Sequence, residues 1–137
     1  MTGGSTYLLD TTTVRTLLQA DAPAELRQRI RTIRYGSVWI SAITEGQLHR
    51  HVRLNPGDRV LSEALGLLLR NVPTVPFDRS AALAYASLQH GSDNQTGITD
   101  AEWMVAGHAL SMEATLVTAE PALRRVANLR SENWLVA

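Results

Sequence analysis

The sequence predicts an α/β fold with three layers, in which a central parallel sheet of about five strands is flanked by helices on both faces. Two observations predict it. Short apolar runs alternate with longer segments of helical periodicity, which is typical of strand–helix–strand units. The chain has 137 residues, the length of one domain, and it contains no internal repeat, low-complexity stretch or linker-like segment. We therefore expect residues 1–137 to form a single domain.

Five segments are expected to form the sheet, because each is a short apolar or extended run bounded by turn or polar residues. They are residues 6–9, 37–41, 72–77, 114–118 and a final extended segment around 134–136. The third segment contains Pro73 and Pro76. Proline cannot donate a ladder hydrogen bond, so this strand is expected to be short or to lie at the edge of the sheet.

Helices are expected wherever apolar residues recur at helical spacing. These segments are residues 11–19, 23–33, 44–54, 58–70, 78–89, 99–112 and 121–126. Two N-terminal signatures accompany them: Thr44 with Gln47, and Thr99 with Glu102, each fit a capping box. Residues 90–97 are polar and contain glycine, which indicates a loop.

Composition narrows the class of protein. Apolar residues make up 45% of the chain and charged residues 19%, as in an ordinary soluble globule. The sequence has no 18-residue apolar stretch, no signal-peptide pattern and no cysteine, so we expect a cytoplasmic protein without membrane spans, disulfides or thiolate metal sites. The net charge is zero, and all 13 cations are arginine. Arginine suits phosphate binding, although base-composition bias in the coding sequence is the simpler explanation.

Acidic or amide side chains recur where the predicted strands end and helices begin. They are Asp10, Glu45, Gln47, Asp100, Glu102 and Glu120. Parallel strands bring their carboxyl ends to one edge of the sheet, where ligands bind in such folds. Carboxylates gathered there repel one another unless a hard cation neutralises them, and oxygen ligands suit Mg²⁺ or Mn²⁺. Metal-activated water attacking a phosphodiester is a chemistry built on such sites.

Each of these acids also has a purely structural interpretation. Asp10 suits the N-cap of the helix that follows it. Glu102 suits the capping box with Thr99, and acids stabilise the positive end of a helix dipole. Glu120 precedes Pro121 and so occupies an N-cap position where shorter side chains are preferred. His108 is expected to be a core histidine.

Five runs in this chain, taken together and in order, resemble the PIN-domain ribonucleases, and within them the VapC-type toxins of toxin–antitoxin pairs. The runs are Tyr7-Leu-Leu-Asp10-Thr11, Ile40-Ser-Ala-Ile-Thr44-Glu-Gly-Gln47-Leu48, Met104-Val-Ala-Gly-His-Ala-Leu110, Ala114-Thr-Leu-Val-Thr118 and Leu129-Arg-Ser-Glu-Asn-Trp134. The resemblance covers nearly the whole chain. It implies a PIN-like fold, Mg²⁺ or Mn²⁺ as cofactor, endonucleolytic cleavage of structured RNA, a homodimer and inhibition by a cognate antitoxin.

The family has four acidic site residues, which correspond by position to Asp10, Gln47, Glu102 and Glu120 in this chain. Only Asp10 keeps the residue type that is usual in the family. The resemblance implies that Asp10, Glu102 and Glu120 hold the cation, with Asp100 restoring an acid to the cluster and Gln47 orienting water or substrate.

Four further residues would support this site. They are Thr11, Thr12 at a position where the family usually has Asn, Glu45 and Thr118. The alternative function is a degenerate PIN domain that binds RNA or an antitoxin without cleaving. Trp103 points away from the predicted apolar face of its helix, which makes it a candidate contact in the homodimer; otherwise it covers a neighbouring helix.

Overall fold

The structure, a computed structural model, describes residues 5–33, 36–88 and 97–135. Five parallel strands form one sheet in the order β3-β2-β1-β4-β5. They are β1 (Tyr7–Leu9), β2 (Val38–Ser41), β3 (Thr74–Val75), β4 (Thr115–Val117) and β5 (Ser131–Glu132). The predicted α/β class and strand number are confirmed, and the proline-flanked β3 lies at the edge as expected.

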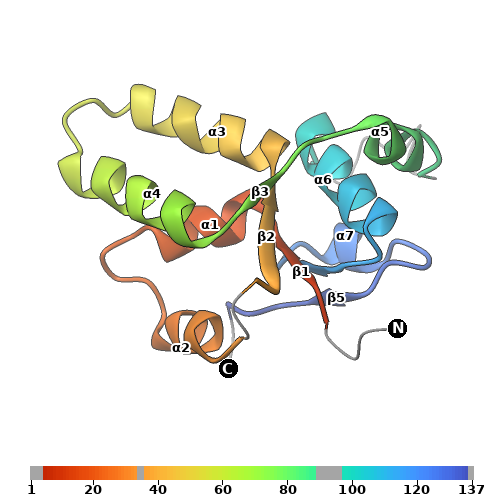
Figure 1. Cartoon of the computed structure of the whole chain (residues 1–137), viewed down its shortest axis with the longest axis horizontal. Coiled ribbons are helices and arrows are strands. Elements are labelled where there is room, and N and C mark those ends of the chain that lie inside the picture. The colour runs from red at the N-terminus through yellow and green to blue at the C-terminus, as the bar shows by residue number, and fades with distance from the viewer. Residues whose placement is uncertain (1–4, 34–35, 89–96, 136–137) are drawn as a thin grey trace.

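Seven helices of the described chain cover the two faces of this sheet (Figure 1). They are α1 (Thr11–Leu17), α2 (Ala24–Thr32), α3 (Ala42–Arg53), α4 (Arg59–Asn71), α5 (Arg79–Ala86), α6 (Asp100–Ser111) and α7 (Pro121–Arg124). Figure 1 shows α1 to α4 on one side of the strands and α5 to α7 on the other. No helix of the described residues is both long and apolar enough to cross a membrane.

The alternation of side chains along β1 builds a separate apolar core on each face of the sheet. Leu9 packs with large aliphatic residues of α1 to α4, such as Val14 and Leu65. Leu8 packs on the opposite face with α6 and α7, where Ala106 and Leu123 are buried. Because β1 lies between β2 and β4 and both of its faces are covered, the residue that follows it emerges at the centre of the carboxyl edge.

Local capping sets where the helices begin. The predicted capping box of Thr99 and Glu102 is present at the start of α6. The one predicted for Thr44 and Gln47 is wrong: Ser41 is the N-cap of α3, its hydroxyl accepts from the backbone N–H of Ile43 at 3.1 Å, and the helix begins at Ala42. The helix therefore starts two residues earlier than predicted, and Thr44 is buried inside its first turn.

Two further expectations are corrected. The last strand is Ser131–Glu132 and not the segment around Trp134, whose buried ring instead packs 5.1 Å from that of Tyr7. Trp103 is only 6% exposed and lies in the apolar core with Leu8, so it is no candidate for a dimer contact. Its helix is enclosed between the sheet and α5, which is why the face that looks exposed in the sequence is buried. Most of the predicted 90–97 loop lies outside the described residues.

Candidate active site

Asp10 stands where the central strand ends, and it acts as both a helix cap and a buried acid. Its backbone N–H donates to the carbonyl of Val117 at 3.0 Å, which extends the pairing of β1 with β4 by one residue. Its carboxylate accepts from the backbone N–H of Thr13 at 2.8 Å, so it is the N-cap of α1. The residue is only 5% exposed. The capping interpretation is thus confirmed, and the same geometry places a carboxyl group at the sheet edge.

The surroundings of Asp10 make its ionised form costly. Burial raises the pKa of this carboxyl above its ordinary value, and hydrogen bonds from Thr118 and Thr13 only partly oppose the effect. The negative charge of Glu102 raises the pKa of Asp10 further. A buried carboxylate with a second carboxylate near it is a group that a bound cation would stabilise.

Gln47 reaches the same edge from α3 but is engaged as a neutral partner. The hydroxyl of Thr11, the residue after Asp10, lies 2.6 Å from Oε1 of Gln47 and 3.0 Å from the hydroxyl of Thr44. Oε1 is an acceptor, so Thr11 donates its single proton to Gln47 and accepts from Thr44. This contact joins the sequence-predicted residues Gln47 and Thr11, the residue that follows Asp10, and Gln47 contributes no charge.

Glu102 and Asp100 lie in the first turn of α6. Oε1 of Glu102 accepts from the backbone N–H of Thr99 at 3.0 Å and from its hydroxyl at 2.9 Å. The backbone N–H of Glu102 donates in return to the hydroxyl of Thr99 at 3.2 Å, which completes the capping box. The side chain of Glu102 still lies near enough to Asp10 to affect its pKa. Asp100 is exposed at the first position of the helix.

Glu120 and Glu45 are directed elsewhere. Glu120 caps its own short helix, with its carboxylate accepting from the backbone N–H of Ala122 at 3.4 Å. Glu45 accepts from the hydroxyl of Thr74 on β3 at 2.5 Å and lies 3.0 Å from Nε2 of His49. Those hydrogen bonds, the one from Thr74 first, lower the pKa of Glu45. Glu45 therefore faces the edge strand, half a helical turn away from Gln47.

Hydroxyl groups complete the edge of the sheet around Asp10. Thr118 is fully buried, donates to Asp10 and accepts from the backbone N–H of Glu120 at 3.1 Å. Thr12 is exposed on the outer side of α1. Buried Thr13 and Thr44 are further polar residues of this region that the sequence did not single out as site residues. The run of three threonines after Asp10 was the available signal for Thr13.

A buried histidine supports the start of α3. Nδ1 of His108 lies 2.8 Å from the hydroxyl of Ser41, and the side chain is 1% exposed, as expected of a core histidine. Burial lowers the pKa of His108, while the charge of Asp78 opposes this shift. Because Ser41 caps α3, this pair fixes the helix that carries Thr44 and Gln47.

The donor set at this edge meets the needs of a divalent cation only in part. Among the residues that the structure describes, no group of three or more His, Asp or Glu side chains converges on a position that could hold a metal ion. Asp10 and Glu102 are two carboxylates, and Gln47 offers an amide oxygen that already accepts from Thr11. As arranged, these residues therefore form an incomplete coordination shell for a metal ion.

Together these features define a class: a three-layer α/β domain with a buried acid at the carboxyl end of its central strand. The sequence matches the PIN domain family over residues 7–129. The chain belongs to that family, which confirms the resemblance carried by the five sequence runs. No curated protein sequence matches the chain.

Solved structures share this fold along nearly their whole length. One is VapBC2 from Rickettsia felis bound to a DNA fragment from their promoter, with a TM-score of 0.78, 23% identity and coverage of 93% of this chain and 98% of that chain. FitAcB from Neisseria gonorrhoeae has a TM-score of 0.75 and 24% identity, and the similarity covers 93% of this chain and 96% of that chain. DNA-bound VapBC from Salmonella typhimurium has a TM-score of 0.74 and 21% identity, with coverage of 95% of this chain and 98% of that chain. At these identities the similarity establishes the fold.

Proposed function

We propose that this PIN-domain chain is a metal-dependent endoribonuclease of the VapC toxin type. Its substrate is structured RNA, its cofactor Mg²⁺ or Mn²⁺, and its inhibitor a cognate antitoxin protein. Membership of the PIN domain family and the shared fold with VapBC structures support the nuclease class.

The observation that carries the proposal is the buried carboxyl of Asp10 beside Glu102. Burial and the like charge of Glu102 both disfavour the ionised form of Asp10. Because a neutral asparagine would cap α1 as well, capping alone does not explain an acid at this position. Functional sites are where such perturbed groups gather. The N-termini of α1 and α6 bring these two carboxylates to one edge, where a phosphodiester and a cation can reach them.

In this proposal Asp10 and Glu102 bind the cation, and Asp100 and Glu120 would complete its ligands only after their side chains turn towards it, since Glu120 caps α7 and Asp100 is exposed. The bound ion would supply an activated water molecule and neutralise the phosphate. The chain's own contribution is to hold the site: Thr118 and Thr13 orient the carboxylate of Asp10, and Gln47 orients water or substrate with its amide.

The test is cleavage of total cellular RNA in millimolar Mg²⁺ or Mn²⁺ by the wild type and by Asp10→Asn. We expect cleavage by the wild type and none by the variant, together with loss of the calorimetric signal of metal binding. The matched control is Asp21→Asn, because Asp21 is exposed in the connection between α1 and α2. Equal cleavage by the wild type and Asp10→Asn would refute the assignment.

A specific observation favours a second function, namely binding of RNA or an antitoxin without cleavage. Gln47 stands where the family resemblance places an acid, and Thr11 holds its carbonyl oxygen at 2.6 Å in a neutral contact. Gln47→Glu separates the two functions. In a weakened nuclease the added carboxylate strengthens metal binding and increases cleavage. In a binding module it adds a repelling charge next to Asp10, lowers the melting temperature and leaves RNA intact.

Assembly and location belong to the same proposal. VapBC-5 from Mycobacterium tuberculosis, another similar structure, is a member of the VapBC family of toxin–antitoxin systems. We propose a corresponding antitoxin partner for this chain, together with a homodimer and a cytoplasmic location. Sedimentation at micromolar concentration measures the dimer, and a monomer there would remove it from the proposal.

A further inference from the structure

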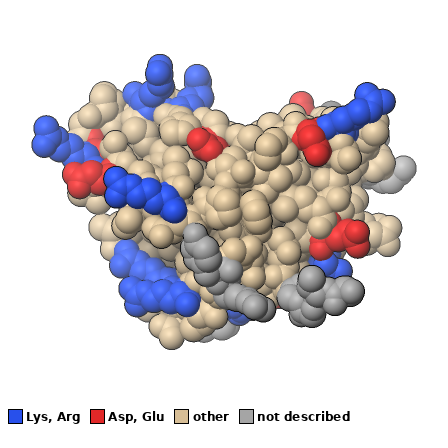
Figure 2. Space-filling model, viewed as in Figure 1, with Lys and Arg blue, Asp and Glu red and all other residues tan. Residues whose placement is uncertain are grey.

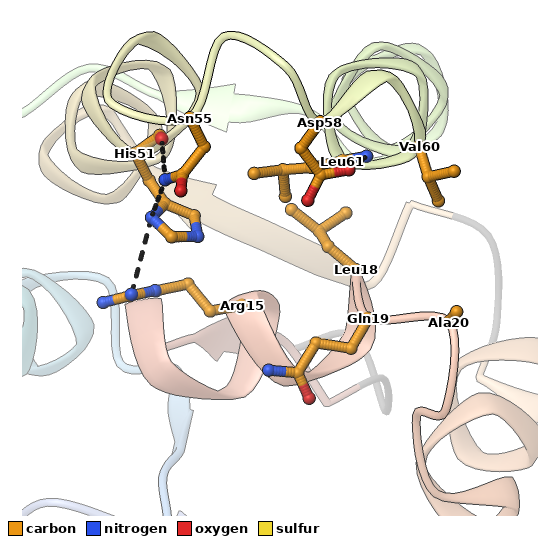
Figure 3. Close-up of a pocket in the computed structure, with 9 residues that line it drawn as sticks. All are labelled: Arg15, Leu18, Gln19, Ala20, His51, Asn55, Asp58, Val60 and Leu61. Carbon is orange, nitrogen blue, oxygen red and sulfur yellow. Dashed lines mark hydrogen bonds between the residues drawn. The ribbon is translucent and has the colours of Figure 1, made fainter.

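A second feature of the α1–α4 side is a cavity of about 380 Å³ between α1, the α1–α2 connection and the junction of α3 with α4 (Figure 3). Leu18 and Leu61 form an apolar floor, and Val60, which is 63% exposed, stands at its rim. Arg15, His51 and Asn55 form a polar end. None of these residues has a role in the candidate active site.

The cavity lies along the line of contact between α1 and α3, the α1–α3 seam, which also contains Thr11 and Gln47 of the candidate active site. Thr11 on α1 meets Gln47 on α3 at 2.6 Å, and Arg15 on α1 meets His51 on α3 at 3.5 Å. Both members of the second pair follow the first by four residues. Four residues of α-helix advance by about 6 Å. The polar end of the cavity therefore begins one helical turn from Gln47 along the same α1–α3 seam.

The hydrogen bonds of His51 fix which ring nitrogen carries its proton. Nδ1 lies 3.5 Å from a guanidinium nitrogen of Arg15 and 3.4 Å from the amide nitrogen of Asn55. Both neighbours are donors, so Nδ1 is the acceptor and the neutral ring carries its proton on Nε2. Figure 3 shows this second nitrogen pointing into the cavity. The polar end thus offers a cationic guanidinium and an N–H donor.

The charges around the cavity favour an anion at this end. The acid in its lining, Asp58, lies across the cavity and uses its carboxylate to cap α4, accepting from the backbone N–H of Leu61 at 3.0 Å (Figure 3). The last turn of α3 adds exposed Arg50 and Arg53 beside His51. Figure 2 shows arginine side chains spread over the α2, α3 and α4 side of the molecule.

We infer that this cavity is a subsite for the RNA substrate next to the active site, in which Arg15 and His51 bind a backbone phosphate. The adjoining ribose and base lie over Leu18 and Leu61. Arginine presents a planar pair of donors that matches phosphate oxygens. An RNA strand would explain both where the cavity lies and which groups line it. A strand whose scissile phosphodiester lies at Asp10 would continue along the α1–α3 seam into the cavity. That the bound strand is RNA rests on the proposed function.

The experiment measures binding of a fluorescently labelled RNA hairpin with a single-stranded loop by anisotropy, in chelator so that no cleavage occurs, over a range of salt concentrations. Arg15→Gln should weaken binding about three- to tenfold and make the slope of log K against log salt shallower by about 0.7, the value for one lost phosphate contact in a single strand. His51→Phe should also weaken binding, because it removes the N–H donor that faces the cavity.

Arg79→Gln is the matched control, since it removes the same charge from an exposed position on α5, on the other side of the sheet. Equal changes in affinity and slope for Arg15→Gln and Arg79→Gln would overturn the subsite. Unchanged RNA binding by Arg15→Gln, with loss of binding to a purified antitoxin, would also overturn it and assign the cavity to a protein. A wild type that neither binds nor cleaves RNA would instead refute the proposed function itself.

Discussion

The two sides of the sheet differ in how closely their helices pack. On the α5–α7 side, small residues let helices approach backbone to backbone: a Cβ added at Gly107 of α6 would lie 2.6 Å from the backbone of Tyr85 on α5. On the α1–α4 side, large aliphatic residues such as Leu65 and Leu68 fill the core, and a cavity remains near the surface.

This difference separates two tasks within one site. The closely packed side holds the acidic residue Glu102 and the buried pair of His108 with Ser41 in fixed positions. The looser side supplies the neutral seam of Thr11 and Gln47, the cavity and most of the neighbouring arginines. Glu102 therefore comes from the closely packed side of the sheet, whereas the surface for a ligand comes from the other side, where Asp10 caps α1.

The largest effect is expected from Gly107→Ala, which attacks the close packing directly. The new methyl group has no space against Tyr85, and the neighbour is backbone, which cannot move aside without shifting α5. Overpacking of this kind costs about 1–3 kcal/mol. Chemical denaturation measures the loss in the free energy of unfolding.

Gly66→Ala on α4 is the matched control for Gly107→Ala. No atom lies within 4 Å of a Cβ added there, and the position is exposed. Replacing glycine inside a helix should therefore stabilise the protein by about 0.5–1 kcal/mol. Equal effects of the two substitutions would show that the two sides do not differ in packing.

A smaller effect is expected from Thr99→Ala, which removes the capping box at the start of α6. The loss of an N-cap costs about 1 kcal/mol. Asp58→Ala removes the N-cap of α4 on the other side of the sheet and should cost about the same. Only Thr99→Ala releases Glu102, so only that variant should change the midpoint of a Mg²⁺ titration. A change of the same size in Asp58→Ala would contradict the assignment of Glu102.

The smallest effect is expected for Asp10→Asn. It concerns how the stability of the fold depends on pH, and its sign tests whether burial disfavours the ionised form of Asp10. Burial raises the pKa of Asp10 above its ordinary value of 3.8, so the folded state binds this proton more tightly than the unfolded state does. The stability that Asp10 contributes is present below pH 3.8 and is lost as pH rises through the higher folded-state pKa.

Asparagine keeps the N-cap without a charge, so Asp10→Asn should melt at a higher temperature than the wild type at neutral pH. This advantage should vanish on acidification towards pH 3.8. Melting curves of both proteins from acid to neutral pH measure it, with Asp58→Asn as the control at an exposed N-cap. A lower melting temperature for Asp10→Asn at neutral pH would show that the site stabilises the ionised carboxylate.

The sequence predicted the elements well wherever the signal was local. The apolar run ending at Asp10, the capping box of Thr99 with Glu102 and the N-cap at Glu120 all concern residues within a few positions of one another. The start of α3 was misplaced because Ser41 and Thr44 are both good caps. Ser41 closes the strand and also contacts His108, so tertiary packing decides between them.

Local patterns were enough to predict the α/β class, the strand-end position of Asp10 and the divergence of Glu45 from Gln47, because periodicity and helical phase are properties of neighbouring residues. Which side chains meet depends instead on how the elements pack against one another. The contact of Thr11 with Gln47 joins residues 36 positions apart, and Arg15 with His51 repeats that separation one turn further along. Both depend on the register at which α1 packs against α3, which no local pattern contains. The coupling of Asp10 to Glu102 likewise exists because β1 ends beside the first turn of α6.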